Sequence, residues 1–263
     1  MRVLMVGDVI GRPGRAAAET VLPALREERS IDLVTVNGEN VAGGMGLTVS
    51  TAASLLAAGA DVITSGNHIW DKKEIYPELD REERILRPLN YGDSGVPGRG
   101  WGLFHAADGS EVAVINAQGR MYMQQIENPF TMLDRLLEEG ADELPSVRIV
   151  DFHCELTSEK NAFGIYLDGR VSAVCGTHTH VATADERILP RGTAYVTDIG
   201  MTGPLYSVIG FDPESVLPRF LNALPTRFEV GSGPVLFNAV QIDVEVASGR
   251  AVAIERLSRV VEV

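Results

Sequence analysis

Short hydrophobic runs alternate with amphipathic segments along most of the chain, and seven of these runs end on a side chain that can bind a metal, a phosphate or a proton. Runs of four or five residues rich in β-branched side chains predict buried strands. We expect strands at residues 3–6, 33–36, 62–65, 112–115, 147–150, 171–175 and 194–197. In layered α/β proteins, ligands bind beyond the carboxyl ends of the strands. The polar side chains that follow these runs should therefore share one edge of the molecule.

Amphipathic segments between the first strands predict helices. Residues 15–29 carry hydrophobic residues at helical spacing, although Pro23 should kink or split this helix. A second helix is expected at residues 48–58, with Thr48 or Ser50 as its N-cap. Strands separated by helices of this length favour a mainly parallel sheet with right-handed crossovers.

The rest of the chain is less regular. Prolines and glycines between residues 71 and 110 predict a loop-rich excursion, and from Val235 to Leu257 the alternation of residues predicts antiparallel strands. Two further helices are expected, at residues 128–137 and 158–166. We find no internal repeat or linker, so we expect a single domain that spans residues 1–263.

The charge of the chain narrows the classes of partner. Among its 263 residues, 45% are hydrophobic and 22% charged, and the net charge is -13. An acidic protein is unsuited to hold a long nucleic acid along a basic groove, whereas bound metals can reverse the local charge for a small phosphorylated substrate. No segment is long and apolar enough for a membrane span or a signal-peptide core, so we expect a cytoplasmic protein. The sequence is compatible with a homo-oligomer.

The two cysteines, Cys154 and Cys175, lie in or beside predicted buried strands. Reduced core thiols are the favoured interpretation. A Cys/His zinc site is the alternative, but Cys175-x-x-His178 is the only pair with suitable spacing.

Two motifs with histidine follow predicted strands. In His178-Thr179-His180, an extended backbone would point both imidazoles the same way, which suits a metal site as well as it suits a chance pair. In Gly66-Asn67-His68, Asn67 could bind a metal through its amide oxygen, and His68 could bind metal or act as an acid. A plain turn with a capping histidine is the alternative for the second motif.

Carboxylates follow the first two predicted strands. Glu39-Asn40 precedes a glycine-rich stretch at residues 42–46, and a carboxylate can bridge two cations. The glycine-rich stretch lacks the lysine and spacing of a P-loop, so we expect a flexible loop near the site. Asp8 could be a ligand or a helix N-cap, and His153 a ligand or a buried structural histidine.

Taken together, these positions favour a metal site. Asn116 and Asp198 could support the site, face phosphate or form turns, whereas His105 has no partner signal and is expected to be structural. A mixture of carboxylate, amide and imidazole donors suits iron, manganese or zinc better than calcium, and six or seven ligands favour two metals. The residues that we expect at one edge of the sheet are Asp8, Glu39, Asn67, His153, His178 and His180.

These motifs resemble those of the calcineurin-like metallophosphoesterases. More closely, the chain is similar to the bacterial YmdB-like branch, a group of 2′,3′-cyclic-nucleotide phosphodiesterases, through residues 37–44, 64–71 and 197–204. The broad superfamily has Asp-x-His on its first strand, where this chain has Asp8-Val9-Ile10. It also has Gly-Asp where this chain has Gly38-Glu39-Asn40, and in the branch Asn40 compensates.

The resemblance implies both a fold and a ligand set. The fold would be a four-layer α/β/β/α sandwich, in which two mixed sheets are flanked by helices. A pair of iron or manganese ions is implied, with zinc as an alternative, and Glu39 would bridge the pair. The first metal would be held by Asp8, Glu39, Asn40 and His180, and the second by Glu39, Asn67, His153 and His178.

The mechanism implied is hydrolysis of a small phosphodiester such as a 2′,3′-cyclic nucleotide. A hydroxide that bridges the metals would attack phosphorus in line, and His68 would stabilise or protonate the leaving ribose oxygen. One alternative is a regulatory protein that binds a nucleotide and turns it over slowly. A non-phosphate metallohydrolase ranks third, because amidohydrolases carry His-x-His on the first strand and this chain carries Asp8 there.

Overall fold

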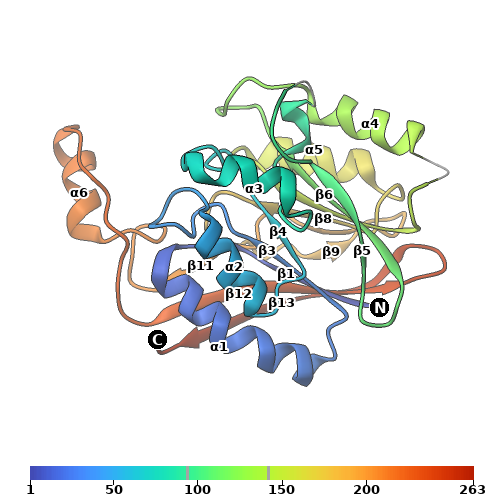
Figure 1. Ribbon diagram of the computed structural model, residues 1–263, viewed down its shortest axis with the longest axis horizontal. Coiled ribbons are helices and arrows are strands. Elements are labelled where there is room, and N and C mark those ends of the chain that lie inside the picture. The colour runs from blue at the N-terminus through green and yellow to red at the C-terminus, as the bar shows by residue number, and fades with distance from the viewer. Residues whose placement is uncertain (93–94, 141–142) are drawn as a thin grey trace.

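Two mixed β-sheets lie at the centre of the protein, with helices on their outer faces (Figure 1). The structure is a computed structural model, and it describes residues 1–92, 95–140 and 143–263. The layers follow the order helix, sheet, sheet, helix, which confirms the predicted four-layer sandwich. The prediction of a single domain over residues 1–263 stays a prediction.

The first sheet contains the N-terminal strands and the C-terminal hairpin. Its order is β2-β11-β12-β1-β3-β4, and β13 pairs with β12. The first, third and fourth strands are parallel, whereas β12 lies antiparallel between β1 and β11. The strands are β1 (Arg2–Val6), β2 (Asp8–Val9), β3 (Leu33–Asn37), β4 (Val62–Thr64), β11 (Met201–Pro204), β12 (Val235–Glu245) and β13 (Arg250–Val261). The sheet is therefore mixed, and the expectation of a mainly parallel sheet holds only for its N-terminal strands.

The second sheet has the order β5-β6-β7-β8-β10-β9. Its four central strands are parallel, and the two edge strands are antiparallel to their neighbours. The strands are β5 (Trp101–His105), β6 (Glu111–Gln118), β7 (Val147–His153), β8 (Ala173–Thr177), β9 (Arg187–Ile188) and β10 (Ala194–Val196). All seven strands predicted from the hydrophobic runs are present in the two sheets.

Helices cover both outer faces. Those of the first sheet are α1 (Gly11–Arg29) and α2 (Val49–Ala57), and those of the second are α4 (Pro129–Glu139) and α5 (Thr157–Leu167). Along the chain, the segment between β4 and β5 contains two short 3-10 helices, η1 (Lys73–Ile75) and η2 (Leu89–Tyr91), and the helix α3 (Tyr76–Arg81). The sixth helix, α6 (Pro213–Asn222), projects from the body of the molecule (Figure 1).

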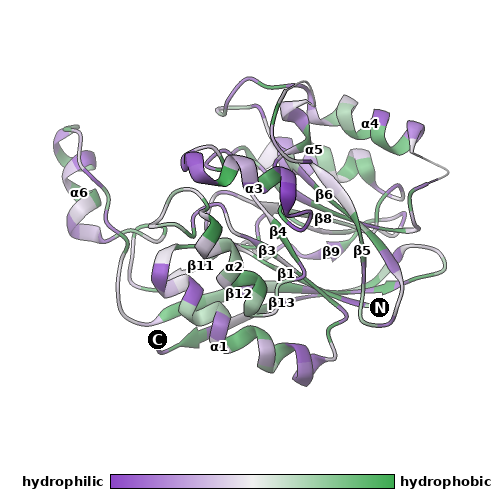
Figure 2. Cartoon of the chain, viewed as in Figure 1, coloured by the Kyte–Doolittle hydropathy of each residue, from purple (hydrophilic) through white to green (hydrophobic). Residues whose placement is uncertain are grey.

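Alternate residues of each central strand pack into different cores. In β1, Val3 and Met5 belong to the core between the two sheets, whereas Leu4 and Val6 belong to the core under α1 and α2. A third core lies between the second sheet and its helices. Successive side chains of a strand point to opposite faces, so a strand covered on both faces is hydrophobic at every position. Figure 2 shows this hydrophobic character along the central strands.

Several local expectations can be compared with the structure. The first helix runs through Pro23 without interruption, so the predicted split is wrong. Thr48 is the N-cap of α2, where its hydroxyl accepts a hydrogen bond from Thr51 N in a capping box. The predicted loop region contains β5, which pairs with β6 along its full length, so the loop expectation is wrong there. Its partly exposed residues and Gly102 hid the strand pattern.

The remaining expectations concern cysteines and location. Cys154 and Cys175 are buried and unpaired with each other, as predicted for core thiols. Within the described part of the chain, no helix combines the length and apolar character needed to cross a membrane. A cytoplasmic location stays a prediction.

Candidate metal centre

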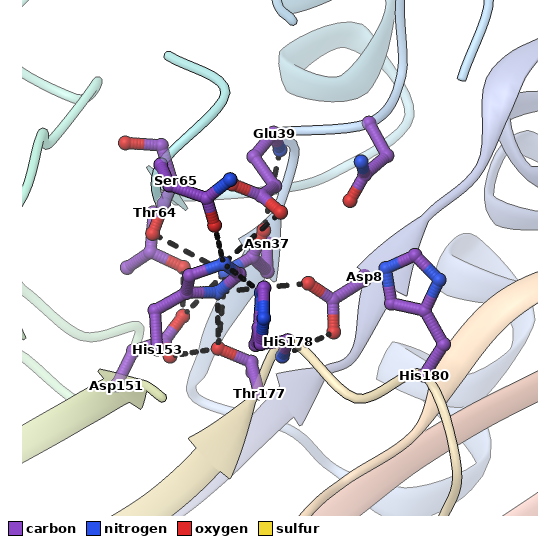
Figure 3. A network of polar contacts seen from close by, with 12 residues as sticks. Asp8, Asn37, Glu39, Thr64, Ser65, Asp151, His153, Thr177, His178 and His180 are labelled. Carbon is purple, nitrogen blue, oxygen red and sulfur yellow. Dashed lines mark hydrogen bonds and ion pairs between the residues drawn. The ribbon is translucent and has the colours of Figure 1, made fainter. Parts of the chain in front are cut away.

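Polar side chains from five separate segments meet at the carboxyl ends of the central strands. Asp8 lies just beyond β1, the Glu39-Asn40 pair follows β3, and the Asn67-His68 pair follows β4. His153 is the last residue of β7, and the loop after β8 carries the other two histidines, His178 and His180. Figure 3 shows that Asp8, Glu39, His153, His178 and His180 gather around one space. The structure therefore brings together the residues that the strand pattern predicted at this edge.

Two groups of three side chains could each hold a cation. One group is Glu39, His153 and His178, and the other is Asp8, Glu39 and His180; within each group the ligand atoms lie within 4.8 Å of one another. Glu39 belongs to both groups. A carboxylate has two oxygens, so one residue can contact two neighbouring metals.

Donor atoms crowd around the ring of His153. Its Nε2 lies 3.0 Å from Glu39 Oε1, 3.0 Å from His178 Nδ1 and 3.1 Å from Asn67 Oδ1. One proton on Nε2 can satisfy only one of these three lone pairs. A cation among them would satisfy all four atoms at once.

Unpaired buried oxygens support the same conclusion. Asp8 Oδ1 and Asn40 Oδ1 are buried and accept no hydrogen bond from the described residues, and Glu39 Oε1 has only the His153 ring beside it, at 3.0 Å. Asn40 Nδ2 donates to Gly44 O at 3.0 Å, so the amide oxygen is oriented for a different partner. A buried oxygen without a partner is costly, and two such oxygens beside the Glu39 carboxylate call for a positively charged ligand. The residues present thus fit a metal site.

The ionisation of the site is set by burial and by Glu39. Burial lowers the pKa of His178 to about 3, so this imidazole is neutral and able to bind a metal. Burial alone would lower the pKa of His153, but the charge of Glu39 and its hydrogen bond outweigh burial and raise it to about 9. Burial raises the pKa of Asp8 to about 6. The proton on His153 therefore supplies the positive charge that the two carboxylates need when no cation is bound.

A buried chain of hydrogen bonds fixes the tautomer of His153. The Thr177 hydroxyl donates to Asp151 Oδ1 at 2.7 Å, so its oxygen is free to accept from His153 Nδ1 at 2.9 Å. Asn37 Nδ2 also donates to Asp151, at 3.0 Å (Figure 3). With hydrogen on Nδ1, the ring presents Nε2 to the site.

The loop that carries His178 and His180 differs from the expectation. Both residues have left-handed backbones, with φ of 98° and 64°, so the assumption of an extended segment is wrong. Asp198 holds the loop, because it accepts from the Thr179 amide at 3.2 Å and hydroxyl at 2.8 Å. Asp198 is itself paired with the buried Lys160 ammonium at 2.5 Å. Loop geometry, and not strand alternation, brings both imidazoles to the site.

Comparison with known proteins agrees with this geometry. The family model of YmdB-like proteins matches residues 4–257. The chain belongs to the YmdB-like family. It is 48% identical to the 2′,3′-cyclic-nucleotide 2′-phosphodiesterase of Bacillus subtilis over 98% of this chain and 96% of that protein.

Two solved structures share the whole architecture of this YmdB-like chain. A hypothetical protein from Thermus thermophilus matches with a TM-score of 0.92 and 44% identity over 99% of both chains. A phosphatase from Mycoplasma pneumoniae matches with a TM-score of 0.93 and 35% identity over 100% of this chain and 94% of the other. The fold is therefore that of the metallophosphoesterase type.

His68 lines a cleft beside the ligand groups of the YmdB-like site. Its backbone amide donates to Glu39 Oε2 at 3.1 Å, and its Nδ1 donates to Asp71 Oδ2 at 2.8 Å. The cleft has a volume of about 270 Å³, and its other walls include Met45, Ile209 and Phe211. The glycine-rich loop at residues 42–46 borders this cleft, as the sequence predicted.

Sequence reasoning missed three contributors to the site. Asp151 anchors the hydrogen bonds behind His153, Asp71 orients His68, and Glu155 lies 3.0 Å from His178 Nε2. Asp71 ends the stretch 64–71 that carried the family resemblance, and Asp151 lies two residues before His153; this proximity was the available signal.

The supporting residues named in advance have different roles. Asn116 accepts from Ser65 N at 2.9 Å and donates to Ser65 O at 3.0 Å, so it fixes the turn that carries Asn67. Asp198 supports the histidine loop. His105 is exposed on β5 and does not belong to either ligand group.

Proposed function

We propose that this YmdB-like chain is a metal-dependent phosphodiesterase that hydrolyses small phosphodiesters, with 2′,3′-cyclic nucleotides as its favoured substrates. The observation that carries the proposal is the pair of ligand groups that share Glu39 at the edge of a metallophosphoesterase fold. The activity of the Bacillus subtilis relative gives the substrate class.

We propose two metal ions at this site, iron or manganese, with zinc as an alternative. Asp8, Glu39, Asn40 and His180 would hold the first, and Glu39, Asn67, His153 and His178 the second. Mixed oxygen and imidazole donors, the unpaired oxygens and the geometry around His153 Nε2 support this assignment. When bound, such a metal pair offsets phosphate charge and lowers the pKa of a shared water toward neutrality.

The chain supplies the remaining functions of the site. Because His68 donates Nδ1–H to Asp71, its ring is fixed and Nε2 is the atom left to act on a leaving ribose oxygen. His68 also donates its backbone amide to Glu39, so the proposed bridging carboxylate and the proposed acid are held in one unit. A second proposed role for the cleft follows from Met45 and Ile209, whose exposed side chains offer apolar contact to a nucleobase.

A substrate panel tests the proposal. Protein purified without chelator is assayed on 2′,3′-cyclic AMP, 3′,5′-cyclic AMP, a linear dinucleotide and AMP, before and after treatment with a chelator. We expect turnover of the 2′,3′-cyclic substrate above the others, lost with chelator and restored by manganese or iron. Tight binding with negligible turnover would favour the regulatory alternative. Undiminished activity in chelator after exhaustive dialysis would refute the metal-dependent reaction.

A further inference from the structure

Four arginines converge on a pocket at the end of the second sheet that is opposite the metal centre. Arg148 lies at the start of β7, Arg170 precedes β8, Arg191 precedes β10, and Arg250 begins β13. Two stand at the start of strands and two in turns, and together these segments enclose a volume of about 170 Å³. The convergence is unexpected in a protein whose net charge is -13.

Most of this positive charge is not neutralised within the chain. The side chains of Arg191 and Arg250 form no ion pair or hydrogen bond with the described residues, and Arg148 donates only to the carbonyl oxygens of Pro145 and Arg170, at 2.9 and 3.3 Å. Burial lowers the pKa of Arg148, since its guanidinium has lost water without gaining a carboxylate.

The carboxylates bonded to pocket residues neutralise only part of this charge. Asp134 pairs with Arg170 at 2.7 Å, and Asp168 accepts hydrogen bonds from the backbone amides of Arg191 and Thr193. Glu245 accepts from the Ser248 hydroxyl at 2.6 Å. Among the described residues, one of the four guanidinium groups thus has a carboxylate partner, and an excess of positive charge and unused N–H donors remains.

Glycines make the close approach of these turns sterically feasible. Gly192 and Gly249 have φ of 102° and 70°, in the left-handed region. A Cβ at Gly192 would lie 2.7 Å from Arg250 Nε, and one at Gly249 would lie 2.0 Å from Ser146 O. A side chain at either position would push the turns apart or displace the Arg250 guanidinium.

We propose that this pocket binds a small phosphate-type oxyanion, such as the phosphate or diphosphate group of a small molecule. Arginine presents several N–H donors in a rigid plane that matches the oxygens of phosphate, and the positive charge of the pocket disfavours cations. Its volume admits a group of this size and not a length of nucleic acid chain. The inference does not depend on the proposed hydrolytic function.

The pocket and the metal centre lie on the same strands. Arg148 and His153 are five residues apart in β7, which is roughly 17 Å along an extended strand. Arg170 and His178 flank β8, and Arg191 and Asp198 flank β10. Three adjacent strands therefore connect the two sites, which are too far apart for one phosphate group to contact both.

The test is calorimetric titration of the full-length protein, purified without chelator, with inorganic pyrophosphate. The wild type is compared with Arg191→Gln/Arg250→Gln and with Arg84→Gln/Arg256→Gln. The control removes the same charge at two exposed surface ion pairs, with Glu82 and Glu186, outside the pocket. Neither Arg191 nor Arg250 forms a side-chain bond with the described residues, so the fold should persist, and thermal unfolding checks this.

We expect one pyrophosphate site per chain to weaken about tenfold or more in the Arg191→Gln/Arg250→Gln variant, since two charge-assisted contacts are lost. The control variant should keep that site, and Arg191→Lys should weaken it by a smaller factor because charge remains without the planar donor group. Pyrophosphate held at the metal centre would be unaffected by all of these changes. Equal titrations for the wild type and both double variants would overturn the proposal. So would a changed oligomeric mass in the Arg191→Gln/Arg250→Gln variant with unchanged pyrophosphate binding, because the pocket would then be an interface between copies.

Discussion

Replacing Gly66 by alanine tests whether the site depends on the close packing between β4 and β7. An alanine Cβ would lie 2.1 and 2.2 Å from Cδ2 and Nε2 of His153 and 2.4 Å from Glu39 Oε2, whereas ordinary van der Waals contacts begin at 3.4 Å. Gly66 does not have a left-handed φ, so the backbone itself accepts alanine. The whole effect of Gly66→Ala therefore comes from a methyl group that is forced between two proposed ligands.

The size of the effect follows from the displacement required. Relief of the overlap moves the His153 ring by roughly 1 Å, and a misplacement of this size can reduce a reaction rate about 100-fold. His153 is completely buried and held by Thr177, so the movement also costs about 1–3 kcal/mol in the free energy of unfolding.

The assay measures metal content per chain, kcat/KM on 2′,3′-cyclic AMP and thermal unfolding. Gly109→Ala is the matched control: Gly109 has a φ of 84° and open space around its Cβ position, so alanine there adds backbone strain without contacting the site. We expect Gly109→Ala to lose stability and retain metal and activity, and Gly66→Ala to lose all three. A Gly66→Ala protein with the metal content and turnover of the wild type would refute the assigned positions of His153 and Glu39.

Two further predictions concern the acid and the proton balance of the site. His68→Ala should reduce kcat on 2′,3′-cyclic AMP while elemental analysis finds the metal content of the wild type, because His68 contacts Glu39 through its backbone amide and not through its ring; loss of metal would instead make His68 a ligand. In metal-free protein the pKa of His153 is raised to about 9 by Glu39 against the effect of burial, so at pH 7 metal must displace a proton from His153. Metal affinity should therefore rise by about tenfold per pH unit up to about pH 9 and level off above it. Calorimetry in buffers of different ionisation enthalpy should also detect the release of about one proton per chain when metal binds at pH 7. Proton uptake, or affinity independent of pH between 7 and 9, would contradict this ionisation.

The edge of the sheet that carries the site could be predicted from sequence. Ligands in layered α/β proteins bind beyond the carboxyl ends of the strands, so it was enough to locate where each strand ends. Asp8, Glu39 and His153 each follow a short run of mainly hydrophobic, β-branched residues, and such runs predict buried strands. The layer order leaves one edge where the carboxyl ends of the central strands converge. The backbone conformation of the loops after the strands was not needed for that prediction.

Loop geometry and edge elements were beyond the sequence patterns. His178 and His180 reach the site through left-handed backbones that depend on Asp198, which is distant in sequence. The helix α6 was not predicted, because Pro218 interrupts its pattern and Phe220 stays exposed instead of marking a buried face.

The arginine pocket illustrates the same limit. Its four residues stand in four separate segments without a shared motif, and only the folded sheet brings them together. In the sequence each of these arginines is an ordinary surface charge.

The central claim is that Glu39 joins two metal ions, and the most direct measurement is anomalous X-ray scattering from crystals of protein purified without chelator. The account predicts two anomalous peaks, roughly 3.5–4 Å apart, on either side of the Glu39 carboxylate. One peak should contact Asp8 and His180, and the other His153 and His178. Absence of any peak at Glu39 in metal-loaded crystals, or a single ion bound away from it, would contradict the account.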